Sequence, residues 1–407
     1  MGKPLPTAAP SPGLKPRRRL TLPRVPKLER RPELDALRGL FLVWMTLTHL
    51  PTHASDLVNQ PFGFVSSAEG FVFLSALLTA RLYIRKAATD EEGLRAKLWK
   101  RALHIYGYHV LLLAFAFTIA AWVGVHTHRL ALTNLLTFYL AHPFTAIIGS
   151  LLLIYCPPLL DILPMYVIFL CASPYILAFA ARRGWKLLIS ASTFIWILAQ
   201  LGLRTWIHWL VVHITHLQIP LQETGAFNLF AWQAVWLLGM WIGAESANPS
   251  PTGGLPFRHL PRYAYPIASF VCLIFLGIRH QWLNWLSPHL TQDGLGLQLD
   301  KWQIGPLRAV NLIAFSIVLY WLRKPVKRIV LIEPFLTLGK ASLEVFCAHI
   351  VFVFIALALL YGEFTQLNGR YSTLVLAFTF TGLILVALRE IRLKRNESAL
   401  SEARRQP

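Results

Sequence analysis

The sequence predicts an all-α integral membrane protein, a bundle of about ten transmembrane helices with both termini in the cytoplasm. The chain has 407 residues, of which 55% are hydrophobic and only 14% are charged. Soluble domains contain about 25% charged residues. Several apolar stretches approach or exceed about 18 residues, the length at which a helix is expected to cross a bilayer. The clearest of these are residues 103–125, 343–361 and 373–388.

The basic residues are distributed unevenly along the chain. The formal net charge of +20 could indicate either a nucleic-acid-binding protein or a membrane protein with basic cytoplasmic loops. When the spans are placed as below, all but six of the 39 Lys and Arg residues fall on one side. The exceptions are Arg129, Arg204, Arg279, Lys301, Arg308 and Arg370. The positive-inside rule predicts that the basic side is the cytoplasm. Nucleic acid is not expected as a partner, because no basic surface stands apart from the membrane flanks.

The chain begins with a basic, proline-rich stretch, residues 1–30. We expect it to be a disordered cytoplasmic tail, not a cleavable signal, because no apolar run precedes the first span. A transmembrane domain is expected over residues 31–389, followed by a charged cytoplasmic tail, residues 390–407. The predicted spans are residues 36–50, 63–83, 103–125, 163–181, 187–203, 230–244, 263–278, 307–322, 343–361 and 372–388.

Loop signals separate these spans. Pro51 ends the first span, because proline lacks the amide hydrogen that a continuing helix needs. The charged run at residues 85–101 separates the second span from the third and is expected in the cytoplasm. Residues 205–225 contain several His and Trp residues, which is typical of a membrane interface, and residues 280–306 form a long outer loop.

The apolar segment 130–161 is interrupted by His142-Pro143 and by Pro157-Pro158. A single crossing here would move the basic residues 182–186 to the outer side, against the positive-inside rule. We therefore predict a re-entrant or interfacial hairpin, in which neighbouring groups satisfy the backbone around the prolines.

Two ionisable residues of the first span share one helix face. Arg38 and His49 are 11 positions apart, which corresponds to about three helical turns and about 16 Å of rise. A cation at the inner end could hold a phosphate group, and an imidazole toward the outer end could act as a general base. The alternative for Arg38 is a flanking residue whose charge extends to the membrane surface.

Other ionisable residues in the spans are also candidates, because charges in a membrane are costly. Glu69 lies in an apolar run and either orients a catalytic histidine or is a buried carboxylate bonded to serine and backbone. Glu344 and His349 are five positions apart in the ninth span, and we predict that they line a cavity. His53 follows His49 by four residues, but Pro51 breaks the helix that would align them, so we do not predict a metal site. We predict instead that His53, like Glu344 and His349, contacts the substrate or lines its cavity.

Six segments resemble the OpgC family in the same order. They are RRPELDALRGLFLVWMTLTHLP (residues 30–51), FGFVSSAEGFVFLSALL (62–78), LWKRALHIYGYHVLLL (98–113), LLDILPMYVIFL (159–170), FNLFAWQAVWLLGMWIG (227–243) and LGKASLEVFCAH (338–349). The last is similar to a motif of the broader transmembrane acyltransferase superfamily.

The resemblance implies an enzyme of the bacterial inner membrane that succinylates osmoregulated periplasmic glucans. The implied donor is cytoplasmic succinyl-CoA, and no permanently bound cofactor is expected. By the same resemblance His49 is the catalytic candidate, Arg38 a donor-side residue and Glu69 a family carboxylate. We hypothesise that His49 takes the proton from the sugar hydroxyl, with Glu69 or Asp35 supporting it. Ala76 departs from the family pattern, which usually has glycine there.

Two other functions are compatible with the same residues. A polysaccharide or lipid transporter would use the polar residues to line a pathway, although the chain has no long internal repeat that would favour this class. An O-acetyltransferase acting on another cell-envelope polysaccharide would share the fold, because acyl size depends on cavity shape. The expected partners are acyl-CoA, a periplasmic glucan or other polysaccharide, and membrane lipids.

Overall fold

The described part of the protein is α-helical and contains no strand, which confirms the all-α prediction. The computed structural model describes residues 31–247, 260–283, 285, 287, 289–362 and 365–403. The predicted tail at residues 1–30 lies outside the described residues. Each predicted span overlaps one of ten helices, although several ends differ by about four residues or more. These helices are α1 (Pro32–His49), α3 (Ser67–Ala87), α4 (Glu91–Phe115), α9 (Ile162–Arg183), α10 (Lys186–Gln200), α12 (Leu229–Ala247), α13 (Ala264–Arg279), α15 (Pro306–Trp321), α18 (Ser342–Ala358) and α19 (Gly369–Ala403).

Shorter elements connect or extend these helices. They are α2 (Ala54–Val58), η1 (Ala116–Ala120), α5 (Ala121–His126), α6 (Leu130–Leu135), α7 (Thr137–Ala141), α8 (Pro143–Leu151), α11 (Leu203–Thr215), η2 (Leu221–Glu223), α14 (Gln292–Leu295), η4 (Gly296–Leu299), α16 (Arg323–Val330) and α17 (Glu333–Lys340). The π-helical turn η1 joins α4 to α5 in one 36-residue helix. At the other end of the chain, α19 continues as a helix through the charged residues expected to form a tail.

By length and composition, four described helices can cross a membrane: α3, α4 with its extension, α9 and α19. Three bent pairs raise the number to seven if each pair is one span: α10 with α11 at 81°, α15 with α16 at 83°, and α17 with α18 at 98°. The protein is therefore a multi-helix membrane protein by composition. About ten crossings and two cytoplasmic termini remain predictions from the positive-inside rule.

The interrupted segment 130–161 folds into three short helices, α6, α7 and α8, followed by an irregular stretch. The break between α7 and α8 lies at His142-Pro143, as the sequence predicts. The longest piece, α8, has nine residues, which is about 13 Å of helix and far less than a bilayer core of about 30 Å. No single piece can cross alone, and the re-entrant or interfacial hairpin stays a prediction.

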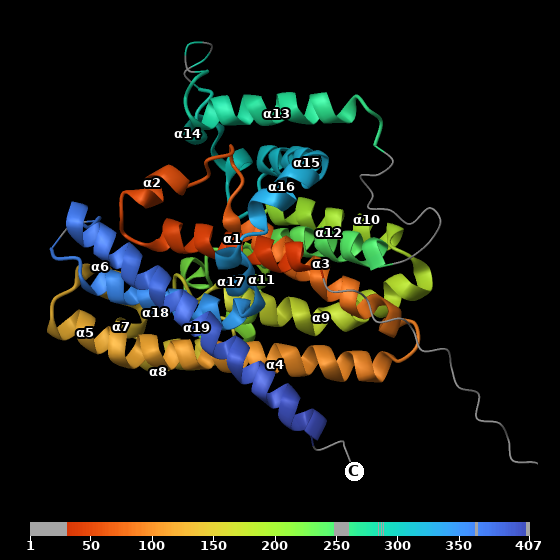
Figure 1. Cartoon of the computed structure of the whole chain (residues 1–407). Helices are drawn as coiled ribbons and strands as arrows, with labels where there is room; N and C mark the ends of the chain where they lie inside the picture. Colours follow the sequence, from red (N-terminus) through yellow and green to blue (C-terminus); the bar gives the residue numbers. More distant parts are fainter. Residues whose placement is uncertain are drawn as a thin grey trace, which may run out of the picture. The chain divides into compact units, whose positions relative to one another are not determined.

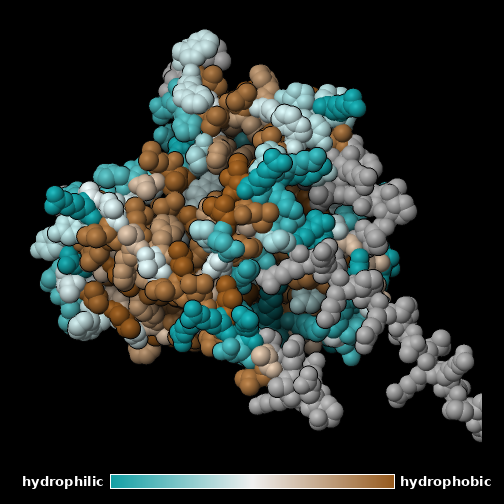
Figure 2. All heavy atoms as spheres, in the orientation of Figure 1, coloured by the Kyte–Doolittle hydropathy of each residue, from teal (hydrophilic) through white to brown (hydrophobic). Residues whose placement is uncertain are grey.

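Helix α1 lies inside the bundle and contacts α3, α17 and α18. Figure 1 shows α4 and α9 side by side, α3 and α12 side by side, and α13 next to α15 at the top of the view. Figure 2 shows a broad hydrophobic area over α18 and α19. Its exposed side chains include Ile355, Leu374, Phe378 and Leu385. Exposed apolar residues on this scale are expected where a protein faces lipid.

Ala76, which stands where the family pattern usually has glycine, is accommodated by a glycine on the facing helix. Ala76 of α3 is fully buried, and Gly239 of α12 lies against it. A Cβ atom at Gly239 would overlap the carbonyl oxygen of Phe73 and lie 2.9 Å from the Cβ of Ala76. Small residues on facing helices allow this close backbone approach. The contact therefore depends on the pair of positions and not on Ala76 alone.

Gly239→Ala is expected to lower the thermal stability of the protein, because its methyl group must push α12 away from α3. Overpacking of this kind costs about 1–3 kcal/mol. Thermal unfolding in one detergent measures the effect. Gly107→Ala is the matched control, because nothing lies within 4 Å of a Cβ atom at that helical position. Equal melting temperatures for the two variants would contradict the close packing.

Candidate active site

Two histidines from opposite ends of the sequence meet inside the bundle. His49 is the last residue of α1, and His349 lies in the middle of α18. The Nδ1 atom of His49 is 3.3 Å from the Nε2 atom of His349. The two rings are stacked, with centroids 5.6 Å apart. The sequence identified both residues, and the fold makes them a pair. His49 lines the larger of the two cavities described below, whereas His349, predicted to line a cavity, is not among the described lining residues of either one.

A backbone carbonyl determines which nitrogens of this pair carry hydrogen. The Nδ1 atom of His349 is 2.5 Å from the carbonyl oxygen of Phe346. A carbonyl oxygen only accepts, so Nδ1–H of His349 must donate, and in the neutral ring Nε2 is then an acceptor. Nδ1–H of His49 donates to that acceptor, so Nε2 is the unprotonated nitrogen of the neutral His49 ring. The chain of bonds therefore presents His49 as a base through Nε2.

The end of α1 places His49 at the edge of a cavity of about 490 Å³, here called the His49 cavity. The chain becomes extended at Leu50, and Pro51 prevents the helix from continuing. The lining is rich in polar side chains. They are Thr48, His49, Ser55, Asp56, Asn59, Ser66, Ser67, Asp161, Gln222, Glu223 and Lys301.

Buried charges in loops shape the electrostatics of the His49 cavity. Burial raises the pKa of Asp161, at the start of α9, to about 6. Its carboxylate accepts a hydrogen bond of 2.9 Å from the backbone N–H of Ala226. Burial also lowers the pKa of Lys301, whose ammonium group lies 4.6 Å from the ring centroid of Trp302. The cavity thus combines carboxylates, an ammonium group and an aromatic face.

A second cavity of about 240 Å³, the Arg38 cavity, is lined mainly by basic and aromatic residues. Its ionisable residues are Arg38, Arg101, His104, Tyr166, Lys340, Glu344 and Lys394. Lys394 is paired with Glu344 at 3.0 Å. The Nε atom of Arg38 is buried and has no hydrogen-bond partner among the described residues. An unsatisfied guanidinium N–H in a cavity is available to an anionic ligand.

The two cavities adjoin each other. Phe346 and Ile162 line both of them. Arg38 and His49, on one face of α1, therefore lie in two neighbouring cavities along the same helix. Both side chains face the protein interior, as their spacing predicts.

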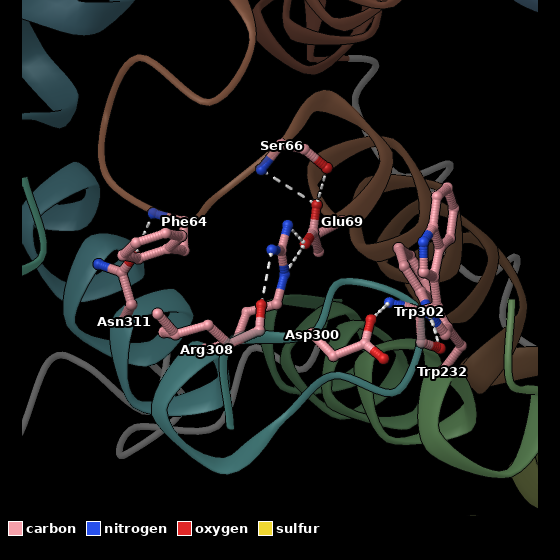
Figure 3. A network of polar contacts seen from close by, with 9 residues as sticks. Phe64, Ser66, Glu69, Trp232, Asp300, Trp302, Arg308 and Asn311 are labelled. Atoms are coloured by element: carbon pink, nitrogen blue, oxygen red, sulfur yellow. Dashed lines mark hydrogen bonds and ion pairs between the residues drawn. The ribbon is translucent and has the colours of Figure 1, made fainter. Parts of the chain in front are cut away.

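Glu69 belongs to a buried ion pair. Its Oε1 atom accepts from Nε of Arg308 at 2.7 Å and lies 2.5 Å from Nη2 of the same side chain. The backbone N–H of Ser66 donates to Oε2 at 3.1 Å, and the Ser66 hydroxyl contacts the same oxygen. Figure 3 shows the Glu69 and Arg308 side chains pointing toward each other. Within the described structure the carboxylate has no hydrogen bond to His49. Of the two alternatives for Glu69, its position favours a buried carboxylate that is bonded to serine and backbone.

The ion pair also contacts the segment that forms one wall of the His49 cavity. Nη1 of Arg308 donates to the carbonyl oxygen of Leu299 at 3.3 Å, two residues before Lys301. The carbonyl oxygen of Trp302 accepts from the indole N–H of Trp232 at 3.1 Å. Glu69 is therefore placed to position the segment that carries Lys301 and Trp302.

The remaining predicted residues lie at three separate places. Asp35 is buried in the first turn of α1, near Arg38 and about 21 Å of helical rise from His49. Glu344 lines the Arg38 cavity. His53 is exposed just before α2 and lies outside the described lining of both cavities. No group of three His, Cys, Asp or Glu residues that could hold a metal occurs among the described residues.

Sequence reasoning missed Arg308, Lys301, Arg101 and Phe346 as site residues. Arg308 and Lys301 carried a usable signal, because both are exceptions to the positive-inside distribution. A basic residue at the outer end of a span requires a structural reason. Phe346 carried no signal from its residue type, because an aromatic residue in an apolar helix is ordinary, although it lies in the family-like segment LGKASLEVFCAH.

No curated protein and no solved structure matches the chain significantly. A family model described as OpgC protein matches residues 30–395, which is most of the chain, and the protein therefore belongs to the OpgC family.

Proposed function

We propose that the protein transfers a succinyl group, or a similar small acyl group, from cytoplasmic acyl-CoA to a hydroxyl of a periplasmic glucan at the bacterial inner membrane. Membership of the OpgC family indicates a membrane acyltransferase-like function. The identity of the donor, the identity of the acceptor and the roles of the site residues are the proposed part. The observation that supports the proposal is the His49–His349 pair, in which His49 lines a carboxylate-containing cavity that adjoins a basic cavity at Phe346 and Ile162.

The Arg38 cavity suits the anionic donor. Acyl-CoA carries phosphate groups and cannot cross lipid, so it must be held at the cytoplasmic side while only its acyl group moves inward. Arg38, Arg101, Lys340 and Lys394 supply positive charge there. Guanidinium groups bind phosphate oxygens with two parallel hydrogen bonds, which also orients the ligand.

The His49 cavity suits a sugar acceptor. Carboxylate oxygens accept hydrogen bonds from hydroxyl groups, and Asp56, Asp161 and Glu223 provide them. Lys301 donates, and Trp302 offers an apolar face. A few convergent polar groups of this kind fix the orientation of a ligand in its pocket.

The reaction requires a group that accepts the proton of the hydroxyl and returns it to the leaving thiolate. Nε2 of His49 takes the proton of the sugar hydroxyl as its oxygen attacks the thioester carbonyl carbon. The C–S bond breaks, and the proton passes to the leaving thiolate. The products are the glucan ester and the free thiol. The thioester supplies the driving force, so the step uses only the two substrates and the chain's own groups.

Purified protein supplied with radiolabelled succinyl-CoA and glucan tests the proposal. Label is expected to appear in an ester on the glucan. A transporter would move glucan or lipid without forming a labelled ester, and that result would refute the enzyme reading. Labelled acetyl-CoA in parallel identifies an O-acetyltransferase. Mass spectrometry of periplasmic glucans from a deletion strain should show loss of the acyl mass.

Arg38→Gln is expected to weaken donor binding. A hydrogen bond to a charged group contributes about 1.5–3 kcal/mol, so KM for acyl-CoA should rise about 10- to 100-fold while kcat changes less. Steady-state kinetics with varied donor measures this change. Lys97→Gln is the control, because Lys97 is an exposed basic residue of α4 outside the cavity lining. An unchanged KM for Arg38→Gln would contradict the donor assignment.

A further inference from the structure

Among the described residues, two side chains line both cavities and so mark the boundary between them. Phe346 of α18 and Ile162 at the start of α9 are the residues common to both linings. They are 2% and 5% exposed, so both are closely packed. They come from different helices and lie at the border of the same two spaces.

The ring of Phe346 is held by aromatic neighbours on two sides. It stacks on Phe71 of α3, with centroids 6.0 Å apart and an interplanar angle of 18°. It meets the His349 ring at 4.9 Å in an edge-to-face arrangement. The carbonyl oxygen of the same residue accepts the His349 hydrogen bond. Phe346 thus forms the partition with its side chain and orients the histidine pair with its main chain.

The proposed reaction requires this partition to open. The hydroxyl oxygen and the thioester carbon must approach to about 3–3.5 Å before the ester can form. The donor phosphates and the acceptor are proposed to occupy different cavities. The acyl end of the donor must therefore pass the place where Phe346 and Ile162 stand.

We propose that Phe346, with Ile162 opposite, is the specificity-determining partition of this enzyme. It separates the cavities in the resting state, admits the acyl end of the donor, and limits the size of the acyl group that reaches His49. The inference rests on the proposed function and deepens it by assigning acyl selection to one position. The ring also excludes water from the thioester while no acceptor is bound, as closed active sites do.

An opened partition has a defined chemical consequence. Water from the His49 cavity would take the place of the sugar hydroxyl. His49 would accept a proton from that water, the C–S bond would break, and the products would be a free carboxylic acid and the thiol. This hydrolysis needs no reactant other than water and the donor.

The test uses full-length Phe346→Ala, with thiol release followed in the presence and absence of glucan. Acyl-CoA donors with two, four and eight acyl carbons are compared. We expect the ratio of hydrolysis to transfer to rise about tenfold or more. Preference for the longest donor should rise by a similar factor, since one methylene in a pocket changes discrimination about 10- to 200-fold. Phe144→Ala is the matched control, because Phe144 is 82% exposed on α8.

Each outcome decides the proposal. A folded Phe346→Ala protein with wild-type hydrolysis and wild-type donor preference overturns it. If that variant does not fold, Ile162→Ala and the milder Phe346→Leu are measured, and an unchanged ratio and preference in both overturns it equally. Wild-type protein that transfers no acyl group from any donor refutes the proposed function instead. The two failures are therefore distinguishable.

Discussion

His49→Ala is expected to slow acyl transfer about 10²–10⁴-fold while the protein remains folded and still binds donor. The variant lacks the only imidazole that is proposed to take the hydroxyl proton, and general base catalysis typically contributes about 10²–10⁴-fold to kcat. The Arg38 cavity does not include His49, so donor binding should be retained. Single-turnover transfer and donor-binding measurements on the same preparation separate the two effects. A folded His49→Ala protein with full transfer activity would refute the assignment of His49 as the general base.

His349 provides the comparison, because it is proposed to act on the reaction only through its contact with His49. His349→Ala removes the acceptor for Nδ1–H of His49 and should reduce kcat less than His49→Ala does. It should also change the pH dependence of kcat, which a merely structural residue would not do. Residues that act as a unit are non-additive, so the double variant should be no slower than His49→Ala alone. If the double variant lost kcat by the product of the two single-variant factors, the two histidines would not act together.

Glu69→Ala is expected to cause the largest loss of stability among the site variants. Glu69 and Arg308 are each 1% exposed. Removing one member of a buried ion pair leaves an uncompensated charge and costs about 3–5 kcal/mol. Loss of the Ser66 contacts at the start of α3 adds to this. Thermal unfolding in a fixed detergent should show a melting temperature well below that of the wild type.

A double-variant cycle tests whether loss of the ion pair causes the lower stability of Glu69→Ala. Glu69→Leu with Arg308→Met should be more stable than either single variant, because an apolar pair of similar size carries no buried charge. Arg182→Met is the surface control: Arg182 pairs with Glu91, but these side chains are 66% and 43% exposed. Exposed pairs contribute about 0–1 kcal/mol. Normal stability of Glu69→Ala with a large loss of kcat would favour the catalytic role of Glu69 instead.

Local patterns predicted the helices and the geometry of α1. Apolar runs and prolines are properties of neighbouring residues, so the helix positions and the break at His142-Pro143 followed from the chain itself. The same holds for Arg38 and His49, because helical periodicity relates residues 11 positions apart without reference to the rest of the fold. The requirement that Glu69 have a partner also followed, since a charge in an apolar run must be compensated.

The identity of the partners depended on packing between distant segments. Glu69 pairs with Arg308, 239 positions away, and His49 with His349, 300 positions away. No helical period extends across such separations, because the intervening loops and bends set which faces meet. Phe346 gains its place between the two cavities only when α18 packs beside α1 and α9 supplies Ile162. Residue type and local spacing thus established the candidate chemistry, and the packing of helices established which groups can act together.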